Sequence, residues 1–337
     1  MGLKIWELIP KKEIEIEGLK GKVLAVDAST IIYQFLSSIR QPDGTPLMDS
    51  KGNVTSHLMG IFTRITRLMS ENIKLIFCFD GAVPEMKFGE TQTRELKKRI
   101  AEEKLLEAIE EKNPELILRY SKQTLRLNEP MMEESKELLK ALGIPVIQSP
   151  AEAEAQCSFI AEKGDAWAVV SQDADTLIYG TPRLIRNLTV SQKRRLPSGT
   201  YVIVKPELIE LKNVLKTLEI NQDQLLALAI LTGTDYNKKG VKGIGPKTAI
   251  KLVKQYKDFD QMFRDVNAEF NWKKVYAVFK SMPIMKNYQL KWKDIDVYRL
   301  KKLLIDKHEF SEERIDKTLN RLQEKNEKKG QKSLGDF

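Results

Sequence analysis

The chain has 337 residues, and its content of 42% hydrophobic and 31% charged residues is typical of a globular protein rather than a disordered one. Lys and Arg number 56 against 47 Asp and Glu, and the net charge of +9 favours a polyanionic partner, either nucleic acid or a membrane surface. Two cysteines are too few for a disulfide scaffold, and the spacing of the two cysteines and two histidines fits no zinc finger. We therefore expect any catalysis to depend on carboxylates.

The first part of the chain predicts strands that alternate with helices. Residues 22–27 (KVLAVD) and 74–80 (KLIFCFD) are short apolar runs, which predict strands covered on both faces, as in a parallel sheet. Residues 29–39 and 55–71 have apolar side chains at helical spacing, and the Pro-, Gly- and Asp-rich residues 40–53 predict a loop.

The character of the chain changes between residues 85 and 129. This segment is highly charged, and its helix formers carry only a thin apolar stripe. Such helices do not belong to a core; they project from the protein or lie over something charged.

Strand and helix signals return after residue 129. A helix over 130–142 ends at a glycine, and a strand over 145–148 leads into a new helix. Ser149 is the expected N-cap of that helix, with Pro150 at its first position and Glu152 completing a capping box.

The remaining pattern defines the fold class. Strands are expected at residues 166–171 and, as edge pieces, at 183–186 and 201–204, and the pattern after residue 205 is helical. We therefore predict an α/β fold with a mostly parallel central sheet flanked by helices. The polar residues 325–337 predict a flexible tail.

Carboxylates follow the strongest strands. Asp27 and Asp80 each end a predicted buried strand, at the sheet edge where ligands bind in open α/β folds. The alternative for Asp27 is an ordinary helix N-cap. Asp173 and Asp175 follow a third strand, and continued strand geometry would point both to one face. Such a pair needs a cation, and oxygen ligands suit Mg²⁺ or Mn²⁺; a plain polar loop is the alternative.

Three more acids are candidates at helix ends. Glu152 and Glu154 are about 200° apart on an ideal helix, so both reach one site only if Glu152 lies in the opening turn. Glu154 is the more direct candidate, because Glu152 also fits the capping box with Ser149. Asp235 closes an apolar helix, and the segment that follows it strengthens its candidacy.

That segment, residues 240–249 (GVKGIGPKTA), fits a helix–hairpin–helix element. Its glycines let backbone N–H groups approach a phosphate, and a helix begins directly after them. We expect the phosphodiester backbone of DNA to be bound by Lys242, Gly243, Gly245 and Lys247. An ordinary glycine-rich turn is the alternative.

A series of segments resembles the motifs of the flap endonucleases, which are structure-specific 5′ nucleases of DNA replication and repair. In order, they are MGLK with LIP, VDAST, TSHLMG, FDG, SPAEAEAQC, QDADTL, GTDY and GVKGIGPKTA. The match spans nearly the whole chain, and a composition rich in Lys and Glu and poor in Cys is compatible with an archaeal member.

The resemblance implies a parallel-sheet nuclease core, a helical arch above it and a helix–two-turn–helix element. It implies two Mg²⁺ ions, replaceable by Mn²⁺, that are held by seven carboxylates: Asp27, Asp80, Glu152, Glu154, Asp173, Asp175 and Asp235. Lys87 and Arg94 correspond to basic residues of the arch that act in catalysis, and Tyr33 corresponds to a tyrosine that stacks on a base. Arg40 begins a loop expected near the DNA junction.

The resemblance also divides the chain. We expect a single nuclease domain over residues 1–324 and a flexible tail over 325–337. Within the domain, the expected parts are a core (1–84 and 130–234), the arch (85–129), the helix–hairpin–helix (235–256) and a C-terminal helical part (257–324).

Two further partners are implied. The turn at 240–244 matches the family's K⁺-binding turn, although Gly240 stands where relatives have a serine, so only backbone carbonyls could bind the ion. The last residues, QKSLGDF, resemble a sliding-clamp-binding motif through Gln331, Leu334 and Phe337. The second aromatic of that motif would be residue 338, and a disordered tail is the alternative.

The expected function is Mg²⁺-dependent hydrolysis of a phosphodiester in branched DNA with a 5′ flap, together with 5′–3′ exonuclease activity. The alternatives are a sister 5′ exonuclease or junction resolvase, an RNA nuclease, and a non-catalytic clamp-associated DNA-binding factor. No uncharged run approaches the ~18 residues of a membrane span. We therefore expect an intracellular protein with no membrane partner, cytoplasmic in a prokaryote and nuclear in a eukaryote.

Overall fold

The computed structural model describes residues 6–41, 43–190, 193–195 and 200–334; within them, the side chains of 88–94, 114, 193–195, 201 and 326–334 are not described. A seven-stranded sheet organises the chain, in the order β1-β9-β6-β5-β2-β3-β4. The five strands from β6 to β4 are parallel, and β9 and β1 are antiparallel additions at one edge. The strands are β1 (Lys12–Glu13), β2 (Val23–Asp27), β3 (Lys74–Phe79), β4 (Val146–Gln148), β5 (Ala168–Val170), β6 (Arg183–Arg186) and β9 (Glu207–Glu210).

The mostly parallel sheet predicted from the sequence is confirmed, but the prediction that the chain is helical after residue 205 is wrong for β9. This four-residue strand pairs antiparallel with β6, whose residues lie more than twenty positions earlier in the chain. Pairing of this kind is set by tertiary contacts, because four residues are too few to show a period. A separate hairpin is formed by β7 (Lys193–Arg195) and β8 (Tyr201–Ile203).

The continuous apolar runs of the central strands are explained by cores on both faces of the sheet. In β2, Leu24 and Val26 belong to one buried cluster and Ala25 belongs to the other. In β3, Leu75 and Phe77 alternate in the same way with the neighbouring Ile76. Since successive side chains of a strand point to opposite faces, both sets must be apolar.

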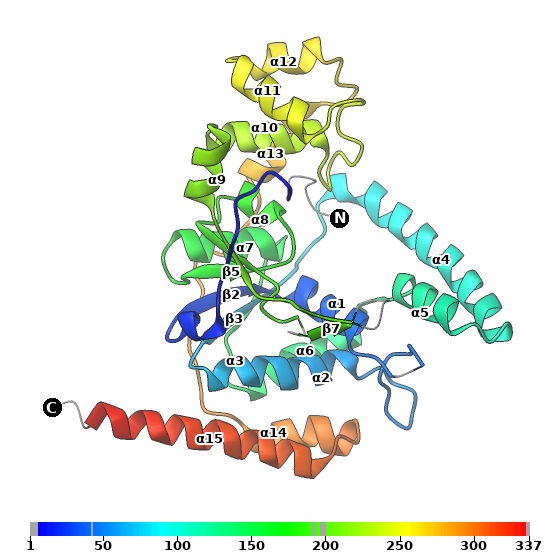
Figure 1. Ribbon diagram of the computed structural model, residues 1–337, viewed down its shortest axis with the longest axis vertical. Helices are drawn as coiled ribbons and strands as arrows, with labels where there is room; N and C mark the ends of the chain where they lie inside the picture. The colour runs from blue at the N-terminus through cyan, green and yellow to red at the C-terminus, as the bar shows by residue number, and fades with distance from the viewer. Residues whose placement is uncertain (1–5, 42, 191–192, 196–199, 335–337) are drawn as a thin grey trace.

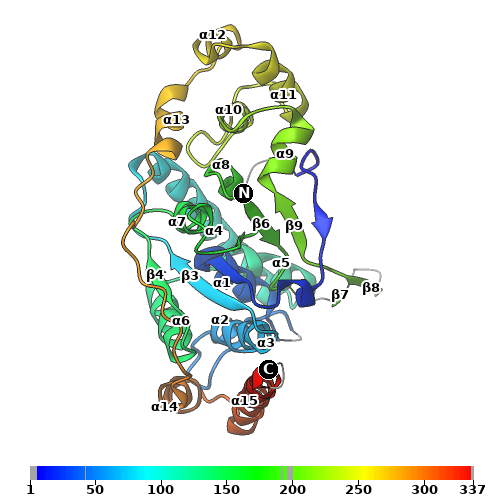
Figure 2. The same ribbon diagram turned by 90° about the vertical axis from the view of Figure 1, so that its left-hand side faces the viewer.

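Helices cover the two faces separately (Figures 1 and 2). The first face carries α1 (Ala28–Ser38), α2 (Ser56–Gly60), α3 (Thr66–Ser70), α6 (Glu129–Ala141), α14 (Val297–Lys301) and α15 (Glu312–Leu334). The second carries α7 (Ala153–Glu162), α8 (Asp175–Ile178), α9 (Leu211–Leu218) and α10 (Gln222–Thr232). Beyond them, α11 (Pro246–Gln255) and α13 (Trp272–Lys280) pack on α10, and α12 (Phe259–Asp265) packs on α11 (Figure 1). The helix expected over 55–71 is α2 and α3 joined by a π-helical turn at Ile61–Ile65. Across the residues that the structure describes, no helix is both long and apolar enough to cross a bilayer.

The charged segment forms two helices that project from the body (Figure 1). After a short 3₁₀ turn at Glu85–Lys87, α4 (Phe88–Glu110) extends outward and α5 (Pro114–Gln123) returns against it. Asn113 caps α5, accepting a hydrogen bond from the backbone of Leu116 at 3.2 Å. We keep the name arch for residues 85–129.

The two histidines of the chain meet at one glutamate in the first-face core. His308 is buried, with its Nδ1 3.0 Å from Asp49 and its Nε2 3.0 Å from Glu134. His57 on α2 is also buried, and its Nε2 lies 3.3 Å from the other oxygen of Glu134. Lys307 pairs with the same carboxylate at 2.9 Å. Both histidines therefore serve packing between α2, α6 and the C-terminal helices.

The C-terminal part of the chain differs from the expected flexible tail. Helix α15 continues through Leu334, so residues 325–334 are helical rather than loose. Glu, Lys and Gln are good helix formers, and Lys325 pairs with Glu71 at the end of α3 at 2.6 Å. Between α13 and α14, residues 281–296 contain no helix or strand and run along the second face; we call them the connector (Figure 2).

Candidate active site

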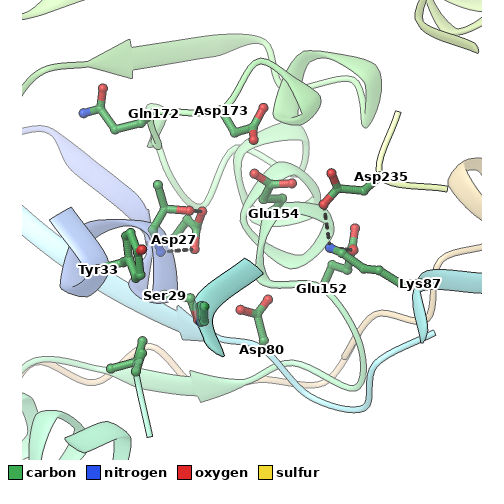
Figure 3. A pocket seen from close by; sticks show the side chains of 13 residues that line it. Asp27, Ser29, Tyr33, Asp80, Lys87, Glu152, Glu154, Gln172, Asp173 and Asp235 are labelled. Carbon is green, nitrogen blue, oxygen red and sulfur yellow. Dashed lines mark hydrogen bonds and ion pairs between the residues drawn. The ribbon is translucent and has the colours of Figure 1, made fainter. Parts of the chain in front are cut away.

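Six of the predicted carboxylates meet around one cavity of about 660 Å³ at the carboxyl edge of the parallel strands (Figure 3). They are Asp27, Asp80, Glu152, Glu154, Asp173 and Asp235. β2 and β3 are parallel neighbours, so their ends bring Asp27 and Asp80 to the same edge. The prediction from strand ends is confirmed for this pair.

Asp27 is the helix N-cap considered as its alternative role, and it also lines the cavity. It is the N-cap of α1, where it accepts hydrogen bonds from the backbone of Thr30 at 3.3 Å and from the Thr30 hydroxyl. The Ser171 hydroxyl donates to it at 3.1 Å. Burial, and then the charge of Asp80, raise the pKa of Asp27 to about 7. A cation in the cavity would stabilise the ionised form of the Asp27 carboxylate.

The predicted cap of α7 is wrong. The helix begins at Ala153, and its backbone N–H donates to Asp80 at 2.8 Å, so Asp80 supplies the cap from another segment. Ser149 instead donates its backbone N–H to Phe79 at 2.8 Å and extends the ladder between β3 and β4. A cap provided by a residue 73 positions away leaves no signal in the local sequence.

The position of Glu152 explains how two acids two residues apart reach one cavity. Glu152 is the N-cap residue of α7, with an extended ψ of 133°, and Glu154 lies in the first turn. The condition stated for a shared site is therefore met. Burial raises the pKa of Glu154 well above its ordinary value, and the charges of Asp173 and Asp27 add to this rise.

Asp173 and Asp175 do not lie along one strand face as predicted. β5 ends at Val170, and the chain turns so that Asp175 opens α8. The backbone N–H of Asp175 donates to the Asp173 side chain at 3.2 Å. Asp173 lines the cavity, whereas Asp175 is buried behind it, close enough to raise the pKa of Glu154.

Lys87 enters the cavity from the base of the arch. Its Nζ lies 2.6 Å from Glu152 and 3.2 Å from Asp235 (Figure 3). Burial alone would lower the pKa of Lys87, but these two carboxylates outweigh burial and raise it above its ordinary value. Arg94 lies in α4, and its side chain is outside the described part of the chain.

The donor set fits hard divalent cations. All candidate ligands are carboxylate oxygens, the type that Mg²⁺ and Mn²⁺ prefer. Burial, and then the charges of neighbouring carboxylates, raise the pKa values of Asp27 and Glu154. Among the described residues, no three His, Cys, Asp or Glu side chains are arranged to hold an ion as they stand. Carboxylates of like charge repel one another, and Lys87 pairs with two of them, Glu152 and Asp235.

The residues predicted to contact DNA divide into two groups. The Tyr33 ring lines the cavity and is 39% exposed, as a stacking residue requires. Arg40 is different, because its guanidinium donates to Ser121 Oγ at 2.8 Å and to the Gly44 carbonyl at 2.7 Å. It therefore ties the loop after α1 to α5 of the arch, and its role as a direct DNA contact stays a prediction.

The hairpin between α10 and α11 presents its predicted residues to solvent. Lys242, Gly243, Gly245 and Lys247 are exposed, and Gly245 is the N-cap of α11. Gly240 has a φ of +55°, and a Cβ there would lie 2.5 Å from the Leu231 carbonyl oxygen. This backbone conformation and the close carbonyl favour glycine at position 240 of this chain.

The clamp-motif residues are only partly described. Gln331 and Leu334 belong to the backbone of α15, and Phe337 lies outside the described residues.

Some residues of the site were missed by sequence reasoning. The Tyr179 hydroxyl donates to Glu152 at 2.6 Å, and Ser29, Lys98 and Gln172 line the cavity. Tyr179 lies two residues after the QDADTL segment, and nothing in its spacing indicates a contact with α7. Lys98 lies three helical turns beyond Lys87, which was a usable signal for a second cation facing the same way.

Comparison with known proteins agrees with this arrangement. The XPG N-terminal domain family matches residues 1–101, and the XPG I-region family matches residues 143–235. Flap endonuclease 1 of Hyperthermus butylicus is 47% identical over 329 residues, which cover 96% of this chain and 94% of that protein. The Pyrococcus furiosus protein of the same name is 48% identical over 323 residues, with 96% and 95% covered.

The solved structure of flap endonuclease-1 from Methanococcus jannaschii superposes with a TM-score of 0.77 at 39% identity and covers 97% of this chain and 100% of that one. The catalytic core of Rad2 in complex with a DNA substrate shares the fold, with a TM-score of 0.69 at 24% identity, covering 96% of this chain and 100% of that one. The identity and the coverage of these relatives lead to one conclusion: the chain belongs to the flap endonuclease family of structure-specific nucleases.

Proposed function

We propose that the chain is a Mg²⁺-dependent 5′ flap endonuclease that cuts one phosphodiester at the junction of branched DNA. The observation that carries this proposal is the convergence of six carboxylates and Lys87 on one cavity beneath the arch. A protein that only binds DNA gains nothing from so many acids facing a polyanion, which argues against a non-catalytic clamp-associated factor.

The carboxylates that line the cavity, with Asp175 behind them, would hold two Mg²⁺ ions, and Mn²⁺ would replace Mg²⁺ at the same oxygen donors. When bound, the two ions supply an activated water and stabilise the leaving 3′-oxygen. Nearby, Asp80 keeps α7 in place through the Ala153 N–H, so its carboxylate is oriented before any ion enters.

Lys87 supplies positive charge where a phosphate must enter. Seven carboxylates exceed the charge of two divalent ions by about three, which would repel a phosphodiester. Lys87 lies among them already, and Arg94 follows about two turns later on α4. Both are proposed to contact the scissile phosphate and to stabilise the negative charge that develops on it.

The surrounding elements provide substrate selection by shape. We propose that a single-stranded 5′ flap passes the arch, that Tyr33 stacks on a base beside the cut, and that the exposed hairpin binds the duplex backbone. A K⁺ ion at the 240–244 turn would be held by backbone carbonyls. The same cavity would also remove nucleotides from a recessed 5′ end.

The remaining proposals concern organisation. One nuclease domain over residues 1–324 would be followed by a clamp-binding end that uses Gln331, Leu334 and Phe337. The protein would act within the cell, on replication and repair intermediates.

One experiment tests the main proposal. A double-flap DNA with a labelled 5′ end is incubated with the protein in Mg²⁺, and the product length is mapped beside a four-way junction of the same sequence. We expect a cut at the flap base that depends on Mg²⁺. Preferential symmetric cutting of the four-way junction would instead favour a junction resolvase, and no cutting of either DNA would refute catalysis.

A further inference from the structure

Helix α7, which presents Glu152 and Glu154, is held from behind by the connector. Gln156 lies one turn after Glu152 and is fully buried. Its Nε2 donates to the Met285 carbonyl at 3.0 Å, and its Oε1 accepts from the Met285 N–H at 2.7 Å. The Gln156 side chain thus pairs both backbone polar groups of Met285, which lies in a segment without helix or strand.

A second series of contacts links α13, the helix before the connector, to Glu152 at the start of α7. The Tyr179 hydroxyl donates to Glu152 Oε2 at 2.6 Å. The Tyr179 ring packs on Phe279, with centroids 5.3 Å apart, and Phe279 belongs to α13, directly before the connector. Phe279 also meets Tyr236, the neighbour of Asp235, edge-on at 5.2 Å.

These contacts reach the hairpin through α10. Asp223 on α10 accepts from the Tyr276 hydroxyl of α13 at 2.8 Å and pairs with Lys280 at 2.6 Å. Helix α10 leads into Asp235 and the hairpin. The connector and α13 together therefore contact both α7, which presents Glu152 and Glu154, and α10, which precedes Asp235.

We propose that Gln156 and Tyr179 are positioning residues that fix the Glu152 and Glu154 carboxylates relative to Asp235, and so set the affinity of the cavity for divalent cations. This inference rests on the proposed function, because it assigns the two residues a role in metal binding. Gln156 acts through the backbone, since its N–H donates to the Glu152 carbonyl at 3.3 Å, and Tyr179 acts on the Glu152 carboxylate itself.

A purely structural role would be different. Gln156 would then stabilise the fold by pairing two partly buried backbone groups, and its loss would lower the melting temperature without changing metal affinity. Partners of metal ligands have a different signature, because their removal typically lowers metal affinity by about 10- to 100-fold.

The test measures Mn²⁺ binding to the full-length, DNA-free protein by calorimetry and by the Mn²⁺ paramagnetic resonance signal. Gln156→Leu keeps the side-chain size and removes both hydrogen bonds to Met285. Tyr179→Phe keeps the ring on Phe279 and removes only the hydroxyl. The control is Tyr288→Phe, which removes a hydrogen bond of 2.5 Å from the same connector to Asp165, at the far end of α7.

We expect Gln156→Leu to weaken Mn²⁺ binding by about 10-fold or more and Tyr179→Phe to weaken it several-fold, within the range for partners of metal ligands. The Mg²⁺ concentration for half-maximal cleavage should rise in parallel, and flap-DNA affinity should stay within about twofold of wild type. Tyr288→Phe should bind Mn²⁺ like wild type.

Wild-type Mn²⁺ affinity in both variants, with only a lower melting temperature, would overturn the inference and leave the proposed function standing. An equal loss in Tyr288→Phe would overturn it as well, because the effect would be general loosening. If Gln156→Leu does not fold, Tyr179→Phe decides the question alone. A wild-type protein that binds no Mn²⁺ and cuts no flap would refute the proposed function itself.

Discussion

Replacing Lys87 by Met should slow the chemical step far more than it weakens DNA binding. Methionine is unbranched and close to lysine in length, but it removes the charge, together with the cation–π contact in which Nζ lies 6.0 Å from the centroid of the Tyr236 ring. In the structure that charge lies 2.6 Å from Glu152 and 3.2 Å from Asp235, at the position where the phosphate is proposed to enter.

The magnitude follows from the place of the charge. The Lys87 side chain is 24% exposed, so a dry-interior Coulomb energy does not apply. Removal of one preorganised group at a developing charge costs roughly 10²- to 10³-fold in rate, about 3 kcal/mol. DNA affinity involves many phosphate contacts, so the loss of one should change it by less than about tenfold.

The assay is single-turnover cleavage of a labelled double-flap DNA by rapid quench, with DNA affinity measured separately by fluorescence anisotropy in Ca²⁺. Lys104→Met is the matched control, because Lys104 lies on α4 beside the Tyr120 ring and does not line the cavity. A Lys87→Met rate within about threefold of wild type would refute this reasoning, and so would an affinity loss as large as the rate loss.

Three further outcomes are expected. Asp173→Ala should abolish flap cleavage in Mg²⁺ with DNA affinity retained, and normal turnover would contradict its place among the metal ligands. Although burial opposes it, hydrogen bonds from the histidines and a lysine lower the pKa of Glu134 to about 2, and burial also lowers the pKa of His57. Both shifts favour the unfolded state on acidification, whereas the raised pKa values of Asp27 and Glu154 favour the folded state, so the test compares wild type with Glu134→Gln at each pH. The difference between their urea midpoints should shrink as pH falls from about 4.5 to 2, and a difference that does not change with pH would contradict this reasoning. Gly143→Ala should cost several kcal/mol in urea unfolding, because φ is +75° and a Cβ would collide with the Lys293 carbonyl; a midpoint equal to wild type would show that the connector yields there.

The sequence allowed the sheet edge and its acids to be predicted, because apolar strands and the acids that end them are local signals. Asp27 and Asp80 could be placed together from strand ends alone, without knowledge of the fold's details. Glu152 could be placed only conditionally, since its position depends on where α7 begins.

What the sequence could not show is mostly controlled by residues distant in the chain. The cap of α7 comes from Asp80, 73 residues before Ala153. Strand β9 forms because it pairs with β6, which lies earlier in the chain. The hydrogen bond that Arg40 donates to Ser121, 81 positions later, could likewise not be predicted from the sequence, and its expected contact with DNA stays a prediction. The helical residues 325–334 were misjudged for a different reason, because their polar composition suits both a loose tail and a solvated helix.

The arch has a further consequence for chain connectivity. Residues 85–129 are inserted between β3 and β4, with α6 completing the crossover, yet these two strands pair directly in the sheet. A break in the backbone at the turn between α4 and α5, where Lys112 has a φ of +51°, would leave both pieces joined by the sheet and the cavity intact. If a free DNA end enters the arch as proposed, the covalent loop around it would then be open, and a nicked form of this protein would be expected to admit a strand from the side. Passage of the strand and cleavage of its phosphodiester would then be separable properties of one polypeptide.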